Sequence, residues 1–305
     1  MGVSEVGSIL ITGGAGFIGS HLVERLVKEG YRVILVDNLL RGNMNNLPRL
    51  LKDVEFVEGD IRNYELMDDI VRKVDTVIHL AALSRVMPSI ENPELCFENN
   101  VKGTEIIARL CSKYNRKLIF SSSREVYGTA KYLPVDESHP LNPENPYGAS
   151  KVAAESIIKA YSKCYGLNYT TLRLTNVYGP RDFDRVIPTF IEKSVKNENL
   201  IVYGEEKLMD FIYISDVVEA FIKALNANEM NLTLNIGSGV GTKILELAKL
   251  IQDMVGGRGG IIIKKTRKGE IERFVSDIKK AREVLRWEPK TALKDGIKEL
   301  LNCHS

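Results

Sequence analysis

The chain has 305 residues, of which 44% are hydrophobic and 27% are charged, and its formal net charge is +2 at pH 7. This composition is ordinary for a globular protein that is large enough for one extensive core or two lobes. The balanced charge gives no reason to expect a nucleic-acid partner. No apolar stretch could span a bilayer or act as a signal peptide, so we expect no membrane partner either. The four cysteines form no C-x-x-C pair and do not cluster with the histidines, so we predict no metal site and no disulfide framework, and we expect a reducing, cytoplasmic setting.

The first predicted elements are a strand, a glycine-rich turn and a helix. The apolar run Ser8–Ile11 is typical of a buried strand, and apolar residues recur at helical spacing from Ile18 to Val27. In the turn between them, Gly13 allows a tight bend, Gly16 lets the backbone approach a pyrophosphate, and Gly19 permits close packing of the helix on the strand. The helix N-terminus adds free N–H groups and a positive dipole end, so this turn predicts a dinucleotide site.

A second strand, Arg32–Val36, ends at an acidic residue, Asp37. A carboxylate at this distance from the glycines can accept both hydroxyls of an adenosine ribose, and its charge repels a 2′-phosphate. The cofactor predicted from this spacing is NAD rather than NADP.

Further strands and helices alternate along the chain. Buried parallel strands are predicted at 76–80, 117–121 and 169–174, with helices at 94–114 and 147–165 between them, which indicates a doubly wound parallel α/β sheet of the Rossmann type. Beyond Pro180 the alternation loosens into helices at 187–196 and 242–255 and a strand at 232–236. We therefore predict an NAD-binding domain over 1–176 with a return crossing near 209–240, and a smaller mixed α/β substrate lobe over 177–208 and 241–305, with a cleft between the two.

Two side chains in the helix 147–165 carry the predicted chemistry. Tyr147 and Lys151 lie at positions i and i+4 and share one face of the helix. We expect the ammonium, and a bound positive nicotinamide, to lower the pKa of the phenol so that it acts as a base near neutral pH. The segment Ser121–Ser123 ends a buried strand and can bring a hydroxyl to the same place.

The sequence resembles the extended short-chain dehydrogenase/reductases, and within them the NAD-dependent nucleotide-sugar epimerases and dehydratases. The resemblance runs from Ser8 to about Pro289 and includes the two motifs above. It also includes four further segments, which are His79-Leu80-Ala81-Ala82, Asn99-Asn100-Val101-Lys102-Gly103-Thr104, Ser121-Ser122-Ser123-Arg124-Glu125-Val126-Tyr127-Gly128 and Arg173-Leu174-Thr175-Asn176-Val177-Tyr178-Gly179-Pro180-Arg181.

The resemblance implies roles for individual residues. Tyr147 would take the proton of the sugar 4-hydroxyl, Lys151 would hold the nicotinamide ribose, and Ser123 would hydrogen-bond the same sugar oxygen. Asp60 and Ile61 would border the adenine. The whole NAD site implied in this way consists of Tyr147 and Lys151 together with Gly13, Gly16, Phe17, Ile18, Gly19, Asp37, Asn38, Asp60, Ile61, Ala81, Ala82, Asn99 and Ser121.

For the substrate, the resemblance implies that Asn176, Arg267 and Glu270 meet the nucleoside diphosphate, with Glu270 where the 4-epimerases usually carry Asp. The family's Arg-Asp-[Tyr/Phe]-[Ile/Val] pattern is Met209-Asp210-Phe211-Ile212 here, so a usual diphosphate-binding arginine is missing. Arg181 or Arg185 is the expected substitute. Phe274 falls where the 4-epimerases carry a residue beside C2 of the hexose, and its bulk favours plain hexoses over 2-acetamido sugars.

The reaction that the resemblance favours is that of a UDP-sugar 4-epimerase, which interconverts UDP-glucose and UDP-galactose through a 4-keto sugar. Dehydratases carry Asp as a general acid where this chain has Arg124, which argues against dehydration, whereas Glu125 also matches the UDP-glucuronate decarboxylases. A decarboxylase or a 4-keto-sugar reductase therefore stays open as an alternative, and a non-catalytic dinucleotide sensor is a remote one. The helices at 94–114 and 147–165 resemble those that form a homodimeric four-helix bundle in the family.

Overall fold

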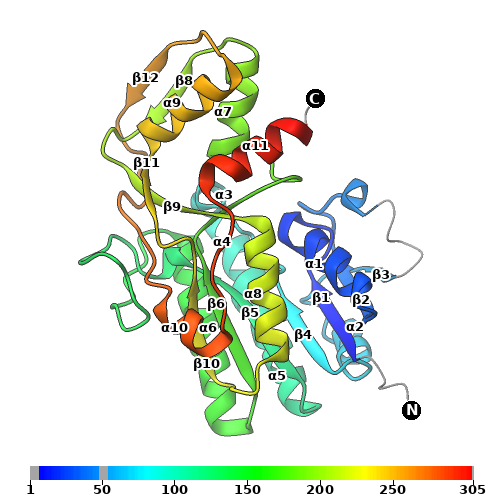
Figure 1. Cartoon of the computed structure of the whole chain (residues 1–305). Helices are drawn as coiled ribbons and strands as arrows, with labels where there is room; N and C mark the ends of the chain where they lie inside the picture. The colour runs from blue at the N-terminus through cyan, green and yellow to red at the C-terminus, as the bar shows by residue number, and fades with distance from the viewer. Residues whose placement is uncertain (1–6, 48–53, 304–305) are drawn as a thin grey trace.

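The computed structural model describes residues 7–47 and 54–303. A seven-stranded parallel sheet forms its centre (Figure 1), with strand order β10-β6-β5-β4-β1-β2-β3. The strands are β1 (Ser8–Thr12), β2 (Arg32–Asp37), β3 (Val54–Glu58), β4 (Thr76–His79), β5 (Lys117–Ser123), β6 (Tyr169–Leu174) and β10 (Leu232–Ile236). The doubly wound parallel sheet predicted from the sequence is confirmed.

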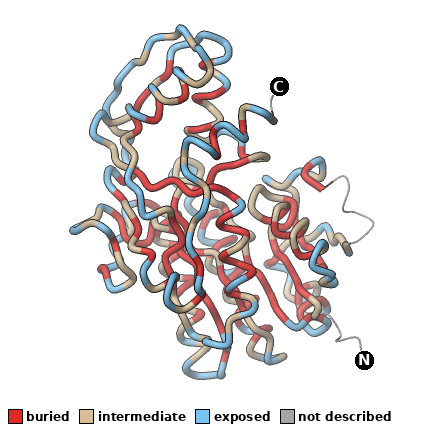
Figure 2. The backbone as a smooth tube through the Cα atoms, in the orientation of Figure 1, coloured by how far each residue is buried: buried red, intermediate tan, exposed pale blue. Residues whose placement is uncertain are grey.

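Helices cover both faces of this sheet. On one face lie α1 (Phe17–Lys28) and α8 (Ile214–Asn226), and on the other lie α2 (Tyr64–Val71), α5 (Gly103–Lys113) and α6 (Pro146–Tyr165). Successive side chains of β1 point to opposite faces of the sheet, so Ile9 and Ile11 pack with residues of α1 and Leu10 packs with residues of α5. The strands are therefore buried from both sides, as Figure 2 shows, and their continuous apolar runs follow from that.

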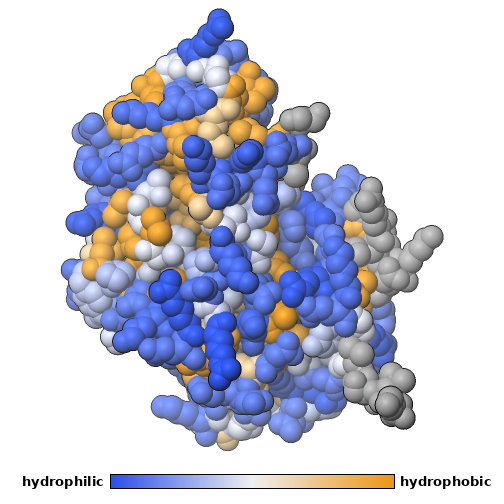
Figure 3. All heavy atoms as spheres, in the orientation of Figure 1, coloured by the Kyte–Doolittle hydropathy of each residue, from blue (hydrophilic) through white to orange (hydrophobic). Residues whose placement is uncertain are grey.

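A smaller mixed lobe lies beyond the carboxyl ends of these strands. It has a three-stranded sheet of order β11-β9-β7 and a parallel pair of β8 and β12. Its elements are β7 (Asn176–Tyr178), α7 (Val186–Val195), β8 (Leu200–Tyr203), β9 (Leu208–Tyr213), β11 (Gly241–Lys243), α9 (Ile244–Val255), β12 (Ile261–Lys264) and α11 (Leu293–Cys303). The chain returns to the main sheet at β10, which pairs with β6, and α10 (Lys279–Leu285) packs near that strand. The face in Figure 3 is mostly hydrophilic, with hydrophobic side chains gathered chiefly over the smaller lobe.

Two predicted helices differ from those observed. The stretch 94–114 is divided into α4 (Pro93–Phe97), a π-helical turn at Glu98–Lys102 and α5, and it follows a separate helix α3 (Val86–Glu91). The π turn buries Asn99 and Asn100, and Asn100 Nδ2 donates to Ser150 Oγ in α6 at 2.9 Å. The helix expected from Thr242 begins at Ile244, because Gly241–Lys243 pair with β9 instead.

The remaining short elements are 3-10 turns at Met44–Asn46 and Arg124–Val126. Within the described parts of the chain, no helix is long and apolar enough to cross a membrane.

Candidate active site

A cleft of about 710 Å³ lies between the carboxyl ends of the sheet strands and the smaller lobe. Residues from both parts line it, from Gly13 in the first turn to Ile271 near the end of the chain. In a parallel sheet this is the edge where ligands bind, because the loops after the strands open there.

The glycine turn has the geometry that its sequence predicts. Gly13 has φ of +75°, and a Cβ on it would lie 2.8 Å from the backbone nitrogen of Ala81. A Cβ on Gly19 would overlap the carbonyl oxygen of Gly13, so this glycine allows helix α1 to begin against the turn. Gly16 is the N-cap of α1 and no side chain caps it, which leaves the first N–H groups of the helix available to an anion. The turn therefore fits a dinucleotide pyrophosphate.

Asp37 presents a carboxylate to the same cleft. Its two oxygens accept hydrogen bonds from backbone N–H groups, at 3.0 Å from Ala15 and 2.9 Å from Leu39. Burial raises the pKa of Asp37 although these two bonds oppose the shift. Each oxygen keeps acceptor capacity for a ribose hydroxyl, so the position suits an adenosine ribose.

The structure separates the other predicted cofactor residues into two groups. Those that line the cleft are Phe17, Ile18, Asn38, Ile61, Ala81, Ala82, Asn99 and Ser121, together with the glycines, Asp37, Tyr147 and Lys151. Asp60 is outside the lining, because its carboxylate is paired with Arg62 at 2.7 Å and accepts from Asn38 Nδ2 at 3.3 Å. Its neighbours Gly59 and Ile61 do line the cleft, and that Asp60 borders the adenine stays a prediction.

Helix α6 brings Tyr147 and Lys151 to the end of strand β5. Asn145 caps the helix by accepting from Gly148 N at 2.8 Å, and Pro146 stands at the first helical position. Ser123, at the end of β5, is close enough to the phenol of Tyr147 to act to lower its pKa. Lys151 Nζ donates to the carbonyl of Ser121 at 2.9 Å and lies 5.9 Å from the centre of the Tyr147 ring.

The expected effect on the tyrosine is wrong for the protein without ligands. Burial raises the pKa of Tyr147 to about 12, and the hydrogen bond from Ser123 only partly opposes this shift. The same burial lowers the pKa of Lys151 to about 8. Because the ammonium is directed at the Ser121 carbonyl rather than at the phenol oxygen, the i, i+4 spacing alone does not activate Tyr147.

Two further charged residues follow Ser123 in the cleft wall. Arg124 pairs with Glu125 at 3.0 Å and donates from Nη2 to Asn176 Oδ1 at 3.2 Å. Glu125 is buried and also accepts from Asn145 Nδ2 at 2.9 Å. Both line the cleft, so Glu125 is a carboxylate of the site that is held by two neighbours.

The loop 181–185 is tied to the cofactor side of the cleft. Arg181 pairs with Glu24 of α1 at 2.9 Å, and the Arg185 guanidinium lies 5.7 Å from the centre of the Phe17 ring. Both arginines line the cleft, as predicted, but they lie against the helix that starts the dinucleotide site.

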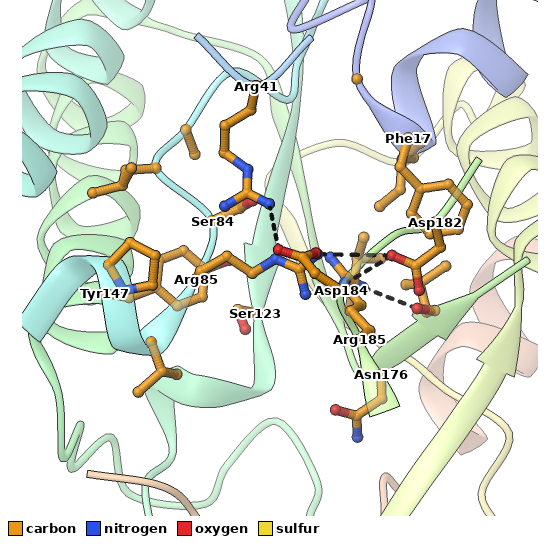
Figure 4. A pocket seen from close by; sticks show the side chains of 18 of the residues that line it. Phe17, Arg41, Ser84, Arg85, Ser123, Tyr147, Asn176, Asp182, Asp184 and Arg185 are labelled. Atoms are coloured by element: carbon orange, nitrogen blue, oxygen red, sulfur yellow. Dashed lines mark hydrogen bonds and ion pairs between the residues drawn. The ribbon is translucent and has the colours of Figure 1, made fainter. Parts of the chain in front are cut away.

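An ion-pair cluster that the sequence did not predict spans this loop (Figure 4). Arg85 pairs with Asp184, which also lies 3.6 Å from Arg41, and Arg185 lies 3.3 Å from Asp182. Burial raises the pKa of Asp182 to about 6 and lowers that of Arg85 to about 10. No periodic or motif signal marks these residues, because their meeting depends on loops from separate parts of the chain.

The opposite wall belongs to the smaller lobe. Arg267 and Glu270 pair with each other there, and Lys207 Nζ lies 2.7 Å from Glu270 Oε2. Asn176 donates from Nδ2 to the carbonyl of Asp210 at 2.8 Å and lines the same cleft. The predicted residues Asn176, Arg267 and Glu270 therefore meet at one site, to which the structure adds Lys207 and Met209.

Phe274 has a different place from the one expected. It is 1% exposed, its ring stacks on that of Tyr127 with centres 5.8 Å apart, and the cleft lining does not include it. The Arg124 guanidinium lies 5.8 Å from the centre of the same ring. Phe274 is thus a core residue behind the wall of the cleft, and the prediction that it lines the hexose pocket is corrected.

Comparisons with known proteins identify the family of the chain. Residues 10–300 match the family described as GDP-mannose 4,6 dehydratase. A putative UDP-glucose 4-epimerase of Methanocaldococcus jannaschii is 46% identical over 303 residues, which cover 96% of this chain and 97% of that protein.

Two solved structures are similar over nearly the whole chain. The UDP-glucose 4-epimerase of Thermotoga maritima with UDP-glucose has a TM-score of 0.92 and 36% identity, covering 98% of this chain and 100% of that one. The UDP-glucose 4-epimerase of Thermus thermophilus in complex with NAD has a TM-score of 0.90 and 33% identity, covering 97% and 98%. The chain therefore belongs to the NAD-dependent nucleotide-sugar epimerase and dehydratase family of the extended short-chain dehydrogenase/reductases.

Proposed function

We propose that this protein is a UDP-sugar 4-epimerase that interconverts UDP-glucose and UDP-galactose through a 4-keto sugar. The observation that carries the proposal is that Ser123, Tyr147 and Lys151, the last on the next turn of the same helix, line one wall of the cleft. Bound NAD supplies the hydride acceptor and donor.

The residues of this chain hold and move the proton. Tyr147 takes the proton from the sugar 4-hydroxyl, while Ser123 donates a hydrogen bond that steadies the same oxygen. Because burial holds the pKa of Tyr147 at about 12, its deprotonation needs additional positive charge nearby. The positive nicotinamide of the bound cofactor supplies it in this proposal, next to Arg185, whose charge already acts to lower the pKa of the phenol.

The neighbouring wall argues against dehydration. A dehydratase needs an acid beside the sugar to protonate the departing hydroxyl, and Arg124 stands where that acid would be. An arginine stays protonated throughout the working pH range and cannot give up its proton.

Decarboxylation of UDP-glucuronate is the second candidate, because Glu125 is a buried carboxylate that lines the cleft. Its oxygens are engaged by Arg124 at 3.0 Å and by Asn145 at 2.9 Å. This pairing supports a structural role for Glu125, and we therefore rank the epimerase first.

The test is to incubate the protein as purified, without added reductant, with UDP-glucose, UDP-galactose and UDP-glucuronate in separate reactions, and with the dTDP, CDP and GDP counterparts. We expect chromatography to show interconversion of the two UDP-hexoses with no net change in absorbance at 340 nm. Accumulation of NADH in proportion to substrate consumed would exclude an epimerase. Release of carbon dioxide from UDP-glucuronate would establish the decarboxylase instead.

A further inference from the structure

We propose that Lys207 binds the diphosphate of the nucleotide sugar, together with Arg267. The inference rests on the proposed function, because it assigns a residue to the substrate side of the same cleft. The family resemblance instead led us to expect Arg181 or Arg185 in this role, as substitutes for the arginine that Met209 replaces.

The strand geometry places Lys207 beside Met209 on the cleft wall. Lys207 immediately precedes strand β9, which begins at Leu208, and Met209 is the second residue of that strand. Both Lys207 and Met209 line the cleft, whereas Leu208 is not among the lining residues. Met209 is 2% exposed and has no charge to offer an anion. Lys207 thus places an ammonium on the same wall of the cleft as the side chain of Met209.

The surroundings of Lys207 are those of an anion site. Its side chain is 13% exposed, and Glu270 is shared between Lys207 and Arg267, each of which contacts a different carboxylate oxygen. Two cations around one carboxylate leave an excess of one positive charge. The Arg267 guanidinium also lies 4.6 Å from the centre of the Tyr203 ring, which lines the same wall.

Glu270 acts in this arrangement as an internal anion that the substrate replaces. Burial lowers the pKa of Lys207, and the contact with Glu270 opposes that shift, so the ammonium depends on a nearby negative charge. A diphosphate carries two negative charges and several acceptor oxygens, and it can engage Lys207 and Arg267 together. Glu270 is then released to accept a hydrogen bond from a ribose hydroxyl.

The two arginines expected from the sequence are less suitable. Arg181 is paired with Glu24 of α1, and Arg185 contacts Asp182 and the Phe17 ring. These partners place both arginines beside the glycine turn, where the pyrophosphate of NAD is expected. The smaller lobe offers Lys207 and Arg267 on the other wall, so each anionic ligand has its own cations.

The test measures the dissociation constant of UDP by calorimetry on the protein with its bound NAD. Lys207→Gln removes the charge, and the matched control is Lys268→Gln, an exposed lysine next to Arg267 that does not line the cleft. Because a hydrogen bond to a charged group is lost, we expect Lys207→Gln to weaken UDP binding by about tenfold to a hundredfold. Lys268→Gln should leave the constant within about twofold of the wild type, a difference worth well under 1.4 kcal/mol.

A second pair of variants restores the charge from the neighbouring position. Adding Met209→Arg to Lys207→Gln returns a cation to the same face, and we expect it to recover at least about tenfold in affinity if the first variant loses a hundredfold. Lys207→Met keeps the apolar part of the side chain and replaces Lys207→Gln if the latter has a lower thermal midpoint than the wild type.

The outcomes separate the inference from the function on which it rests. Unchanged UDP binding in Lys207→Gln and Lys207→Met overturns the inference and leaves the epimerase proposal intact. Equal losses in Lys207→Gln and Lys268→Gln also overturn it, because they would show a general effect of charge. If the wild type binds none of UDP, dTDP, CDP and GDP, both the inference and the proposed function are wrong.

Discussion

Replacing Lys151 should stabilise the protein while removing a group that the proposed mechanism needs. Lys151 is 3% exposed, and its ammonium donates a hydrogen bond to the carbonyl of Ser121 at 2.9 Å. Burial has lowered its pKa from 10.5 to about 8, which means that the folded protein holds the charged form at a cost. We therefore expect Lys151→Met, which keeps a long unbranched side chain, to remove that cost.

The size of the effect depends on pH. A pKa depressed from 10.5 to about 8 corresponds to about 3 kcal/mol of unfavourable free energy at pH 7. The unfolded chain binds more protons at this site than the folded one between pH 8 and 10.5, so the cost falls as the pH rises, to about 1 kcal/mol at pH 10. The variant also loses the hydrogen bond to Ser121, which reduces its gain in stability by about 1 kcal/mol at pH 7. The advantage of the variant should thus shrink by about 2 kcal/mol between pH 7 and pH 10.

Urea unfolding of nucleotide-free protein at pH 7, 8, 9 and 10 measures this difference. Comparison with the wild type cancels the titrating groups that do not interact with Lys151, including Tyr147, whose raised pKa acts above pH 10 and with the opposite sign. The ammonium acts to lower the pKa of the Cys96 thiol, so both proteins carry Cys96→Ala in this comparison. Lys163→Met, at an exposed position on the same helix, is the control and should run parallel to the wild type. Parallel curves for Lys151→Met and the wild type would refute the reasoning, because they would mean that the buried lysine has an ordinary pKa.

Three other changes test different parts of the site and the assembly. Tyr147→Phe should lower kcat at least about 100-fold with an unchanged thermal midpoint, and a rate near that of the wild type would remove the phenol from the mechanism. Phe274→Ser should lower the free energy of unfolding in urea by about 3 kcal/mol because it leaves a cavity beside Tyr127. It should change kcat/KM for UDP-glucose and for its N-acetyl counterpart by the same factor. A selective gain in kcat/KM for the N-acetyl sugar would restore Phe274 as a specificity residue. We propose a homodimer formed through the surface of α5 and α6, which pack together, and light scattering that reports a monomer at micromolar concentration would contradict it.

Most of the main sheet could be predicted from the sequence because the strands other than β3 have a local signal, whereas β3 (Val54–Glu58), at the edge of the sheet, was missed. Parallel strands buried on both faces are rich in apolar residues, and Ile9–Ile11 and Val33–Val36 show that pattern within single short segments. The π turn at Glu98–Lys102 has no such signal, since its residues continue a helical pattern on either side. Strand β11 was missed for a related reason, because the three residues Gly241–Lys243 become a strand only by pairing with β9.

The site residues divide in the same way. Gly13, Asp37, Tyr147 and Lys151 could be found from spacing, because a turn or a helix fixes their relation over a few residues. Lys207 could not, since its partner Glu270 is 63 residues away and nothing in a local pattern connects them. Phe274 shows the converse error, because a position matched along the chain does not decide whether a side chain faces the cleft or the core behind it.

The charges in the cleft form two separate clusters, which suit the two anionic ligands that we propose for it. On the cofactor side, Arg41, Arg85 and Arg185 surround Asp182 and Asp184, and on the substrate side Lys207 and Arg267 surround Glu270. Each cluster has one more cation than it has carboxylates. Paired charges of this kind keep the arginine and lysine side chains in place before a ligand arrives, which lowers the entropy that binding must overcome. The excess charge in each cluster favours an anion over water, so we propose that the pyrophosphate of NAD and the diphosphate of the sugar nucleotide bind at separate walls.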